Sequence, residues 1–403
     1  MKFISKKKHF IVLITALFLL IKASAQTEEP IKSPQREVVT LYSDILKEDR
    51  KIFIYTPKDS VNPAKAYPVV YVMDPENHFN MLVEYSKYLS GKNVMPPLIV
   101  VGIANTDRVR DLTPSQGNTD SYGKSDTTAN SWAKTSGGNE QFLTFIEKEL
   151  MPYVNLHYKS QPYRIFAGHS FGGIAAINCL INHPEMFDAY IATSPSLWWD
   201  QKYLLKFADR KLKSGSALSK TLFFSDGNEG SFPGSSFHTD ALKFDSLLKK
   251  RNIKGLDFQY MHYPAESHST VPVKSNYDGL RFIFRQWELP HHQIDDEKVN
   301  SGIIMAHYKN LSQKFGYQIL PDEVYIDDWG QWLLKEQATR NSGINLLEMN
   351  TVNYPYSSRA FAALGAAYAI KGEKQKALAS YKQASELNPS STEIKLRLQE
   401  LQK

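Results

Sequence analysis

Cysteine is almost absent from this sequence, which has a single one, Cys179, among 403 residues. One thiol cannot form an internal disulfide bond, so a disulfide-stabilised scaffold is excluded. The neighbours of this cysteine include alanine, isoleucine and leucine, which favours a buried apolar residue over a nucleophile. The HExxH motif, paired cysteines and a glycine-rich phosphate loop are missing as well. We therefore expect no metal ion and no other cofactor.

The N-terminus has no apolar run long enough to cross a membrane. Phe10–Ile21 is an apolar stretch of 12 residues, whereas a membrane-spanning helix needs roughly 20. Lysines precede this stretch and Ala23-Ser24-Ala25 follows it, which is the pattern of a secretory signal peptide with its cleavage site. We predict that residues 1–25 are removed and that the protein is exported, to the periplasm or out of the cell. No cysteine follows the cleavage site, so no stable membrane anchor is expected.

Outside that leader the sequence has little net charge. The formal net charge is +6, and residues 1–25 carry five lysines and no acidic residue, so the rest of the chain is close to +1. The basic isoelectric point therefore reflects the leader, and a nucleic-acid-binding surface is not predicted. Apolar residues make up 42% and charged residues 22% of the chain, which is ordinary for a folded globular protein and argues against long disorder.

What the sequence does contain is an alternation of short apolar runs and amphipathic segments. Glu37–Thr56 alternates apolar and polar residues around a polar break, which predicts an antiparallel β-hairpin. Later apolar runs predict buried strands at Val69–Met73, Leu98–Ile103, Arg164–Ala167, Ala189–Ala192, Thr221–Phe224 and Leu256–Tyr260, with helices at Gln141–Val154, Phe171–Asn182, Thr239–Arg251 and Ser275–Trp287. This alternation is typical of the α/β class, with a mainly parallel sheet flanked by helices.

The C-terminal part, beyond about Pro290, has no strand pattern and predicts a small all-α region. Ser358–Ser391 has the spacing of a tetratricopeptide repeat, with Phe361, Leu364, Gly365, Tyr368, Ala377, Tyr381, Ala384 and Pro389. A degenerate repeat precedes it. Two repeats are too few for an independent solenoid, so the tail is expected to dock on another surface or to contact a protein partner. We predict three parts: the signal peptide 1–25, an α/β domain 26–290 and a helical tail 291–403.

One motif carries a specific chemistry. Gly168-His169-Ser170-Phe171-Gly172 follows a predicted strand and opens a predicted helix. In the nucleophile elbow of α/β hydrolases a serine occupies such a turn, where its hydroxyl is exposed and glycines relieve crowding. The helix start also places N–H groups and the positive end of the helix dipole near developing negative charge. We predict that Ser170 is a nucleophile.

A serine nucleophile needs a base, and an acid must hold that base in one tautomer. In this fold the chain order is serine, acid, histidine. His268 lies in the loop between the last predicted strand and the final helix of the α/β domain, and is the predicted general base. The loop after Thr221–Phe224 offers two acids, Asp226 and Glu229. Glu229 lies further into the loop and is preferred, with Asp226 as the alternative.

An oxyanion hole, which stabilises the negative oxygen of the intermediate, needs two N–H donors. The backbone N–H of Phe171, next to the nucleophile, is the first predicted donor. The second should come from the loop after the strand Val69–Met73, within the run Asp74–His78.

Arginine and tryptophan residues follow two of the predicted strands. Arg108 and Arg110 come after one strand, and Trp198 and Trp199 after another. Ligands of open α/β sheets bind beyond the carboxyl ends of the strands. Guanidinium groups suit anions and indole rings suit aromatic or sugar rings, so the four residues are predicted to flank one substrate cleft with Ser170. The alternative is that both arginines form internal ion pairs and both tryptophans lie in the core.

Four runs of this sequence resemble the esterase family that includes enterochelin and other siderophore esterases, S-formylglutathione hydrolases, feruloyl esterases and mycolyltransferases. The likeness is strongest to the exported, siderophore-esterase-like branch. The runs are Val101–Ile103 with Thr106–Pro114, Gly168–Gly173, Ser194–Asp200 and Glu266–His268, all within residues 36–290. The repeat-bearing tail is similar to one that is appended to some members.

The resemblance implies an α/β-hydrolase fold with Ser170 as nucleophile and His268 as base. It supports the acid in the loop that contains Glu229, and it implies the backbone of about Glu76 as the second oxyanion donor. The family usually has Asp-Gly where this chain has Asp74-Pro75, and proline has no N–H. Substrates of the family include siderophore, acyl-sugar, aryl and thiol esters.

The sequence therefore predicts an exported serine esterase that hydrolyses a small-molecule carboxylic ester through an acyl-enzyme intermediate. Two other classes remain open. An acyltransferase would use the same residues and pass the acyl group to an alcohol or a sugar. A non-catalytic binding protein would act through the repeat tail and would lack a reactive serine.

Overall fold

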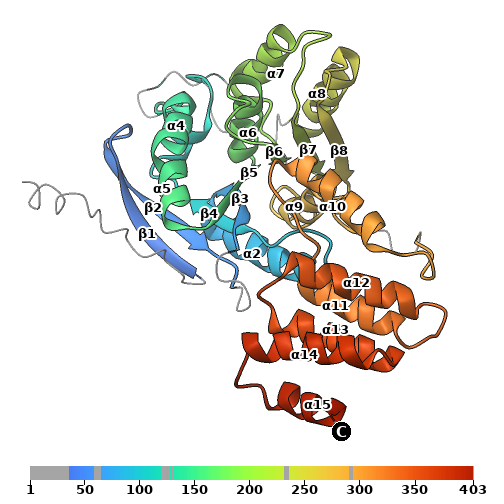
Figure 1. Cartoon of the computed structure of the whole chain (residues 1–403). Helices are drawn as coiled ribbons and strands as arrows, with labels where there is room; N and C mark the ends of the chain where they lie inside the picture. The colour runs from blue at the N-terminus through green and yellow to red at the C-terminus, as the bar shows by residue number, and fades with distance from the viewer. Residues whose placement is uncertain are drawn as a thin grey trace, which may run out of the picture.

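The computed structural model describes residues 36–58, 65–118, 125, 128, 131–230, 236–289 and 294–402. The predicted signal peptide, residues 1–25, lies outside these ranges, and its removal stays a prediction. No helix in the described ranges is both long enough and apolar enough to cross a membrane. Figure 1 shows a central sheet with helices around it, and a helical C-terminal region in orange and red.

One sheet of eight strands forms the centre of the protein, in the order β1-β2-β4-β3-β5-β6-β7-β8. The strands are β1 (Arg36–Ser43), β2 (Glu48–Tyr55), β3 (Tyr67–Met73), β4 (Ile99–Ile103), β5 (Ser160–His169), β6 (Ala189–Thr193), β7 (Thr221–Gly227) and β8 (Asp257–Tyr263). Strand β2 is antiparallel to both β1 and β4, and the other neighbours are parallel. The predicted N-terminal hairpin and the mainly parallel sheet are confirmed.

Strand β3 shows why the central strands appear in the sequence as continuous apolar runs. All seven of its residues are buried, because both faces of the sheet are covered. Val70 and Val72 belong to the apolar cluster on one face, and Tyr71 and Met73 to the cluster on the other. Each fully buried side chain of this size stabilises the fold by about 1.5–3 kcal/mol, so the sheet is anchored from both sides.

Helices cover the two faces of the sheet in separate groups. The face of Tyr71 and Met73 carries α4 (Asn139–Phe145), α5 (Met151–His157), α6 (Phe171–Asn182), α7 (Trp199–Lys211) and α8 (Phe237–Arg251). The other face carries α2 (Pro75–Gly91) and α9 (Val271–Ile283), and a short helix α3 (Arg108–Leu112) follows β4. This three-layer arrangement is the α/β-hydrolase fold.

Several helix boundaries differ from the predicted ones. A π-helical segment, η1 (Ile146–Leu150), separates α4 from α5 inside the predicted helix 141–154. Pro152 in the first turn of α5 has no N–H to continue the hydrogen-bond ladder, which fits a change of register there. Helices α2 and α7 were not predicted. Asp74-Pro75 at the start of α2 resembles a turn, and α7 begins with a kink at Asp200–Lys202, where φ is positive.

The described chain after residue 294 is entirely helical apart from its connections. Its helices are α10 (Ser301–Phe315), α11 (Glu323–Leu333), α12 (Arg340–Asn353), α13 (Ser358–Lys371), α14 (Lys374–Leu387) and α15 (Thr392–Gln402). The ring of Phe315 in α10 lies 4.9 Å from that of Tyr163, 5.3 Å from that of Phe284 and 5.8 Å from that of Trp287, between centroids. The tail therefore docks on the α/β part of its own chain (Figure 1).

Small residues mark the closest contacts between paired helices of the tail. A Cβ on Gly365 of α13 would lie 2.8 Å from the ring of Tyr381 of α14. A Cβ on Gly330 of α11 would likewise lie 2.8 Å from Leu347 of α12, which precedes Tyr381 by one repeat length of 34 residues. The two helix pairs therefore share one kind of close approach. That they belong to the tetratricopeptide class stays a prediction.

Candidate active site

The predicted nucleophile Ser170 stands at the turn between β5 and α6. Strand β5 ends at His169 and helix α6 begins at Phe171. The backbone of Ser170 has φ 61° and ψ −113°, a combination that residues with a side chain rarely adopt. A serine held in this strained conformation between a strand and a helix has the geometry of a nucleophile elbow.

Close backbone contacts around this turn explain two of its glycines. A Cβ on Gly168 would collide with the backbone of Gly172. A Cβ on Gly173 would lie 2.9 Å from the Cα of Pro195 and 3.1 Å from the carbonyl oxygen of Thr193. A side chain at either position would therefore force the turn apart or push α6 away from β6.

Hydrogen bonds from the β6 side hold the turn in place. The Ser170 N–H donates to the carbonyl oxygen of Thr193 over 2.9 Å, and the Ser196 N–H donates to that of Ser170 over 3.2 Å. The hydroxyl oxygens of Ser170 and Ser196 are 3.1 Å apart. Ser196 belongs to one of the runs that carry the family resemblance, but no pattern in the sequence indicated that it lies beside the nucleophile.

Glu229 is the acid that contacts His268. Its Oε2 lies 2.9 Å from Nδ1 of His268, and only 1% of its side chain is exposed. Its Oε1 accepts hydrogen bonds from the Ser194 hydroxyl and, over 3.2 Å, from the Gly227 N–H. A buried carboxylate bound in this way orients the imidazole through Nδ1, so that Nε2 is the atom that would exchange a proton with a nucleophile.

The ring of His268 lies next to the nucleophile turn. Its centroid is 4.5 Å from that of His169, the residue before Ser170, and 4.8 Å from that of Phe237. The structure thus brings a serine, a histidine and an acid together at the carboxyl ends of β5, β7 and β8. These elements are far apart in the chain and meet only through the parallel order of the sheet.

Asp226, the alternative acid, contacts a different set of side chains. Its carboxylate accepts a hydrogen bond from the Tyr260 hydroxyl over 2.6 Å and lies 2.8 Å from Nδ1 of His238 and 3.1 Å from Nδ1 of His262. In the part of the chain that the structure describes, Asp226, His238 and His262 are the one group close enough to hold a metal ion. This group was not predicted from the sequence, because the three residues follow no known ligand spacing.

Two further histidines lie on one side of the predicted base: His169 contacts its ring, and His78 contacts His169. Burial holds the pKa of His169 well below its usual value, and the proximity of His268, His78 and Arg108 lowers it further. Burial also lowers the pKa of His78, whose ring lies 5.5 Å from that of His169. Both rings are therefore neutral at pH 7.

These shifted pKa values predict a loss of stability in mild acid. Above about pH 6.5 both histidines are neutral in the folded and the unfolded chain, and they have no effect. Below that pH the unfolded chain binds protons that the folded chain does not, so the free energy of unfolding falls by up to about 1.4 kcal/mol per pH unit for each histidine. Urea unfolding between about pH 5 and pH 7.5 measures this slope. His169→Asn should make the free energy of unfolding depend less steeply on pH. An unchanged pH dependence in that variant would contradict the role given to His169.

The first turn of α2 contains the second predicted oxyanion donor. Helix α2 begins at Pro75, so the N–H of Glu76 lies where backbone donors have no acceptor within the helix. A Cβ on Gly172 would lie 3.1 Å from the Cβ of Met73 and 3.9 Å from a carboxylate oxygen of Asp74. The start of α2 is therefore beside the nucleophile turn, where Phe171 opens α6 in the same way.

The backbone at Asp74-Pro75, where the family usually has Asp-Gly, accommodates the proline. Asp74 itself adopts the left-handed conformation, with φ 53° and ψ 56°. Hydrogen bonds to its side chain offset the cost of this backbone strain. Its carboxylate accepts hydrogen bonds from Arg108 over 2.8 and 2.9 Å and from Asn105 over 2.8 Å. Pro75 occupies the first turn of the helix, where its missing N–H costs nothing. The proline is therefore compatible with Glu76 as the first N–H donor of α2.

Three of the four predicted substrate-binding residues gather around the ring of Phe171. The guanidinium carbon of Arg108 lies 5.3 Å from its centroid, and the rings of Trp198 and Trp199 lie at 6.1 and 5.2 Å. Trp132, from the polar segment after α3, stacks on the same ring at 5.6 Å. Trp198 is half-buried, whereas Trp199 is only 2% exposed. Of the two tryptophans, Trp198 is thus the one with surface to offer a ligand.

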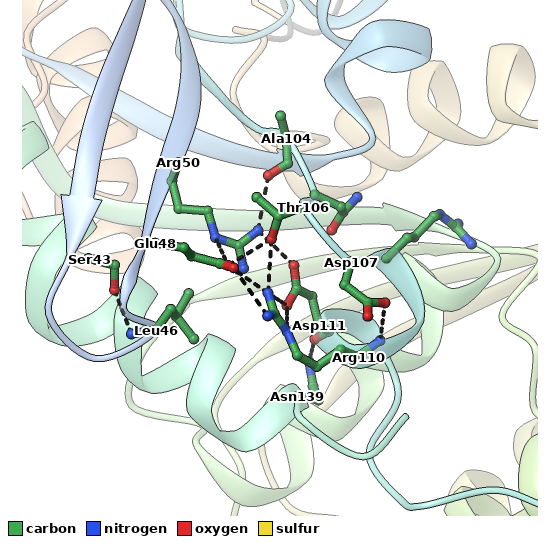
Figure 2. A network of polar contacts seen from close by, with 12 residues as sticks. Ser43, Leu46, Glu48, Arg50, Ala104, Thr106, Asp107, Arg110, Asp111 and Asn139 are labelled. Atoms are coloured by element: carbon green, nitrogen blue, oxygen red, sulfur yellow. Dashed lines mark hydrogen bonds and ion pairs between the residues drawn. The ribbon is translucent and has the colours of Figure 1, made fainter. Parts of the chain in front are cut away.

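Arg110 lies in a network of ion pairs between β2 and α3, which Figure 2 shows. Its guanidinium binds Glu48 at 2.6 Å and Asp111 at 2.8 Å. Asp111 also pairs, at 2.7 Å, with Arg50, whose side chain is fully buried. The structure does not bring Arg110 to the nucleophile. Arg110 forms internal ion pairs and Trp199 packs in the core. For these two residues the contacts are those of the alternative prediction, in which they do not line the substrate cleft.

Known proteins resemble this chain in sequence and in fold. A family model described as "Putative esterase" matches residues 43–270, which include the serine, the histidine and both acids. Ferri-bacillibactin esterase BesA of Bacillus subtilis is 28% identical over 242 residues, covering 56% of this chain and 82% of BesA. The siderophore triacetylfusarinine C esterase of Aspergillus fumigatus is 30% identical over 181 residues, covering 39% of this chain and 61% of that protein. The crystal structure of an IroE-like serine hydrolase from Shewanella oneidensis is 31% identical with a TM-score of 0.69, covering 79% of this chain and 99% of that one.

Proposed function

Because this chain belongs to that esterase family and is a carboxylic ester hydrolase, we propose that it is an exported serine esterase for siderophore esters. One observation carries the mechanism. The buried carboxylate of Glu229 lies 2.9 Å from Nδ1 of His268, whose ring packs at 4.5 Å on His169, the residue before Ser170. This is the arrangement by which an acid orients a base beside a nucleophile.

The proposed reaction has two steps. Ser170 Oγ attacks the ester carbonyl carbon while His268 Nε2 takes its proton, and the backbone N–H groups of Phe171 and Glu76 donate to the developing oxyanion. His268 then returns the proton to the leaving alcohol, which leaves an acyl-enzyme. In the second step His268 takes a proton from water, the hydroxide attacks the acyl carbon, and the acid is released as Ser170 regains its proton. In both steps the carboxylate of Glu229 holds His268 through Nδ1–H and stabilises its imidazolium form.

The substrate class rests on the relatives and on the surroundings of Ser170. Two relatives are named as esterases of the siderophores ferri-bacillibactin and triacetylfusarinine C. In this chain the half-buried Trp198 packs between Phe171, at 6.1 Å, and Phe237, at 6.2 Å. Phe237 in turn contacts His268. We propose that this aromatic wall binds the body of the siderophore while the ester carbonyl lies at Ser170.

A substrate panel tests this proposal. The protein is incubated with bacillibactin and triacetylfusarinine C, each with and without iron, and with p-nitrophenyl acetate, and the products are identified by mass spectrometry. We expect opened siderophore products and a kcat/KM at least about tenfold above that for the small ester, because binding of remote groups contributes to catalysis. Acyl transfer to added glycerol in place of hydrolysis would indicate an acyltransferase instead.

Trp198 provides the matched variant for this panel. Trp198→Ala is expected to lower kcat/KM for the siderophores by roughly tenfold and to leave p-nitrophenyl acetate hydrolysis within about twofold, because the small ester does not reach this ring. Trp199→Ala removes a core side chain and should lower both activities together with the melting temperature. A parallel loss of both activities in Trp198→Ala would contradict a binding role.

We further propose that residues 1–25 direct export, which is supported by the sequence pattern alone. N-terminal analysis of the protein from the producing cell tests this: a mature chain that begins at Gln26 agrees with export, and one that keeps Met1 contradicts it. The division into an α/β part, 26–290, and a tail, 291–403, belongs to the same proposal.

A further inference from the structure

The side chains of Asp226, His238 and His262 point toward one another. Asp226 is three residues before Glu229 in the chain. Asp226 lies near the end of β7, His238 in the first turn of α8 and His262 near the end of β8. One donor atom of each lies within 4.8 Å of those of the other two. Both histidines turn Nδ1 toward the carboxylate of Asp226, at 2.8 and 3.1 Å, and their ring centroids are 4.2 Å apart. The Tyr260 hydroxyl, 2.6 Å from the same carboxylate, completes the group.

The donor atoms are those that zinc and related divalent transition metals prefer, two imidazole nitrogens and a carboxylate oxygen. Around a tetrahedral ion with bonds of about 2.0–2.1 Å, the ligand atoms stand roughly 3.4 Å apart. His238 Nδ1 lies 2.8 Å from one oxygen of the Asp226 carboxylate and His262 Nδ1 lies 3.1 Å from the other. One ligand atom of each residue lies within 4.8 Å of those of the other two, so small movements of these side chains would admit an ion. Each neutral imidazole would bind through Nδ1 and keep its hydrogen on Nε2.

Burial separates this group from a chance cluster of surface residues. The side chain of Asp226 is 1% exposed, and those of His238 and His262 are 45% and 33% exposed. The carboxylate is thus held inside the protein, where an ionised group requires a charged or hydrogen-bonded partner. Both rings are partly exposed, so an ion can reach the group from solvent, and a water molecule would supply the fourth ligand.

We propose that Asp226, His238 and His262 bind one divalent transition metal ion of the zinc class. The ion joins the ends of β7, α8 and β8, and it braces both sides of the loop that carries Glu229. Phe237, directly before His238, packs at 4.8 Å on the ring of His268, so the ion also fixes one wall around that histidine. The ion takes no part in the ester chemistry, and this inference stands independently of the substrate.

Metal titration tests the site directly. The full chain is purified without a polyhistidine tag, stripped with EDTA and dialysed into chelator-free buffer. Calorimetry with Zn²⁺ is expected to give one ion per chain with a micromolar or tighter Kd, and Zn²⁺ should raise the melting temperature. Co²⁺ should give the visible absorption bands of a tetrahedral complex, and Mg²⁺ should not compete, since it prefers octahedral oxygen ligands.

Matched variants decide whether these side chains are the ligands. The double variant H238Q/H262Q is expected to bind Zn²⁺ at least roughly 100-fold more weakly and to lose the Co²⁺ bands. The control is His183→Gln, whose histidine pairs with Glu140 and Glu185 through its two ring nitrogens. Among the described residues these three side chains do not form a group close enough to hold an ion, so this variant should bind Zn²⁺ like the wild type. If the double variant does not fold, His238→Gln alone, at the more exposed position, carries the test with an expected loss of about tenfold.

Two results would overturn the site. One is Zn²⁺ binding that is unchanged in a folded H238Q/H262Q or H238Q variant. The other is a wild-type chain that binds no Zn²⁺ at micromolar concentrations, which would leave a hydrogen-bonded group without a metal. Because binding is measured without an ester, either failure is distinct from a failure of the esterase assignment.

Discussion

Replacement of Ser170 by alanine is expected to lower kcat for ester hydrolysis by roughly 10⁵–10⁶-fold. The loss is this large because the acyl group is bonded to Ser170 in the proposed mechanism, and the serine and its base act as one unit. KM for a short aryl ester should change little, since the rest of the site still binds it. The variant should fold normally, because alanine and serine meet the same cost at φ 61°. Steady-state kinetics and a melting curve measure both expectations.

Ser196 is the control for this experiment. Its hydroxyl oxygen is 3.1 Å from that of Ser170 and is buried beside it. Ser196→Ala removes one neighbouring hydroxyl and should lower kcat by less than about tenfold, the effect of one modest hydrogen bond. Substantial activity in Ser170→Ala, combined with none in Ser196→Ala, would move the nucleophile to Ser196.

The second large effect is expected for Glu229→Gln, which should lower kcat by roughly 10³–10⁴-fold with little change in KM. The carboxylate holds Nδ1–H of His268 at 2.9 Å and stabilises the imidazolium that forms in the transition state. A neutral amide provides no such charge, and it can hold the ring in the wrong tautomer. The defect lies in the transition state, so it appears in kcat and not in substrate binding.

Asp226→Asn is the matched comparison for Glu229→Gln. The two acids are three residues apart, both are buried, and each has its own partners. The contacts of Asp226 are with Tyr260, His238 and His262, so its substitution should lower kcat by less than about tenfold. The reverse ranking of the two variants would move the catalytic acid to Asp226.

The fold was predictable where local sequence pattern and burial agree. The apolar runs of β3, β6 and β7 are buried on both faces, and such strands are recognisable from the sequence alone. Helix α7 escaped prediction because its first residues, Asp200–Lys202, have positive φ, which no helical pattern announces. The break between α4 and α5 was missed for a similar reason, since one proline changes the hydrogen-bond register without changing the apolar spacing.

The parts of the candidate site that could be predicted are those where the fold requires a particular residue type at a particular position along the chain. Ser170 in its elbow and His268 after the last strand follow from the order of the fold. Contacts across the sheet were not predictable in this way. Nothing in the sequence around Arg110 indicates that it binds Glu48, 62 residues away, while Arg108 turns to Asp74. The group of Asp226, His238 and His262 likewise forms because α8 begins beside the ends of β7 and β8.

Covalent labelling directly tests whether Ser170 is the activated nucleophile. The protein is treated with a fluorophosphonate, digested, and analysed by mass spectrometry for the site and the extent of modification. If Ser170 is the activated nucleophile, we expect one phosphonyl group per chain on the peptide that contains Ser170, formed in parallel with the loss of esterase activity. We expect no labelling in Ser170→Ala. Failure of the wild-type protein to label, or labelling of Ser170→Ala at the wild-type rate, would contradict the claim that Ser170 is the activated nucleophile of this enzyme.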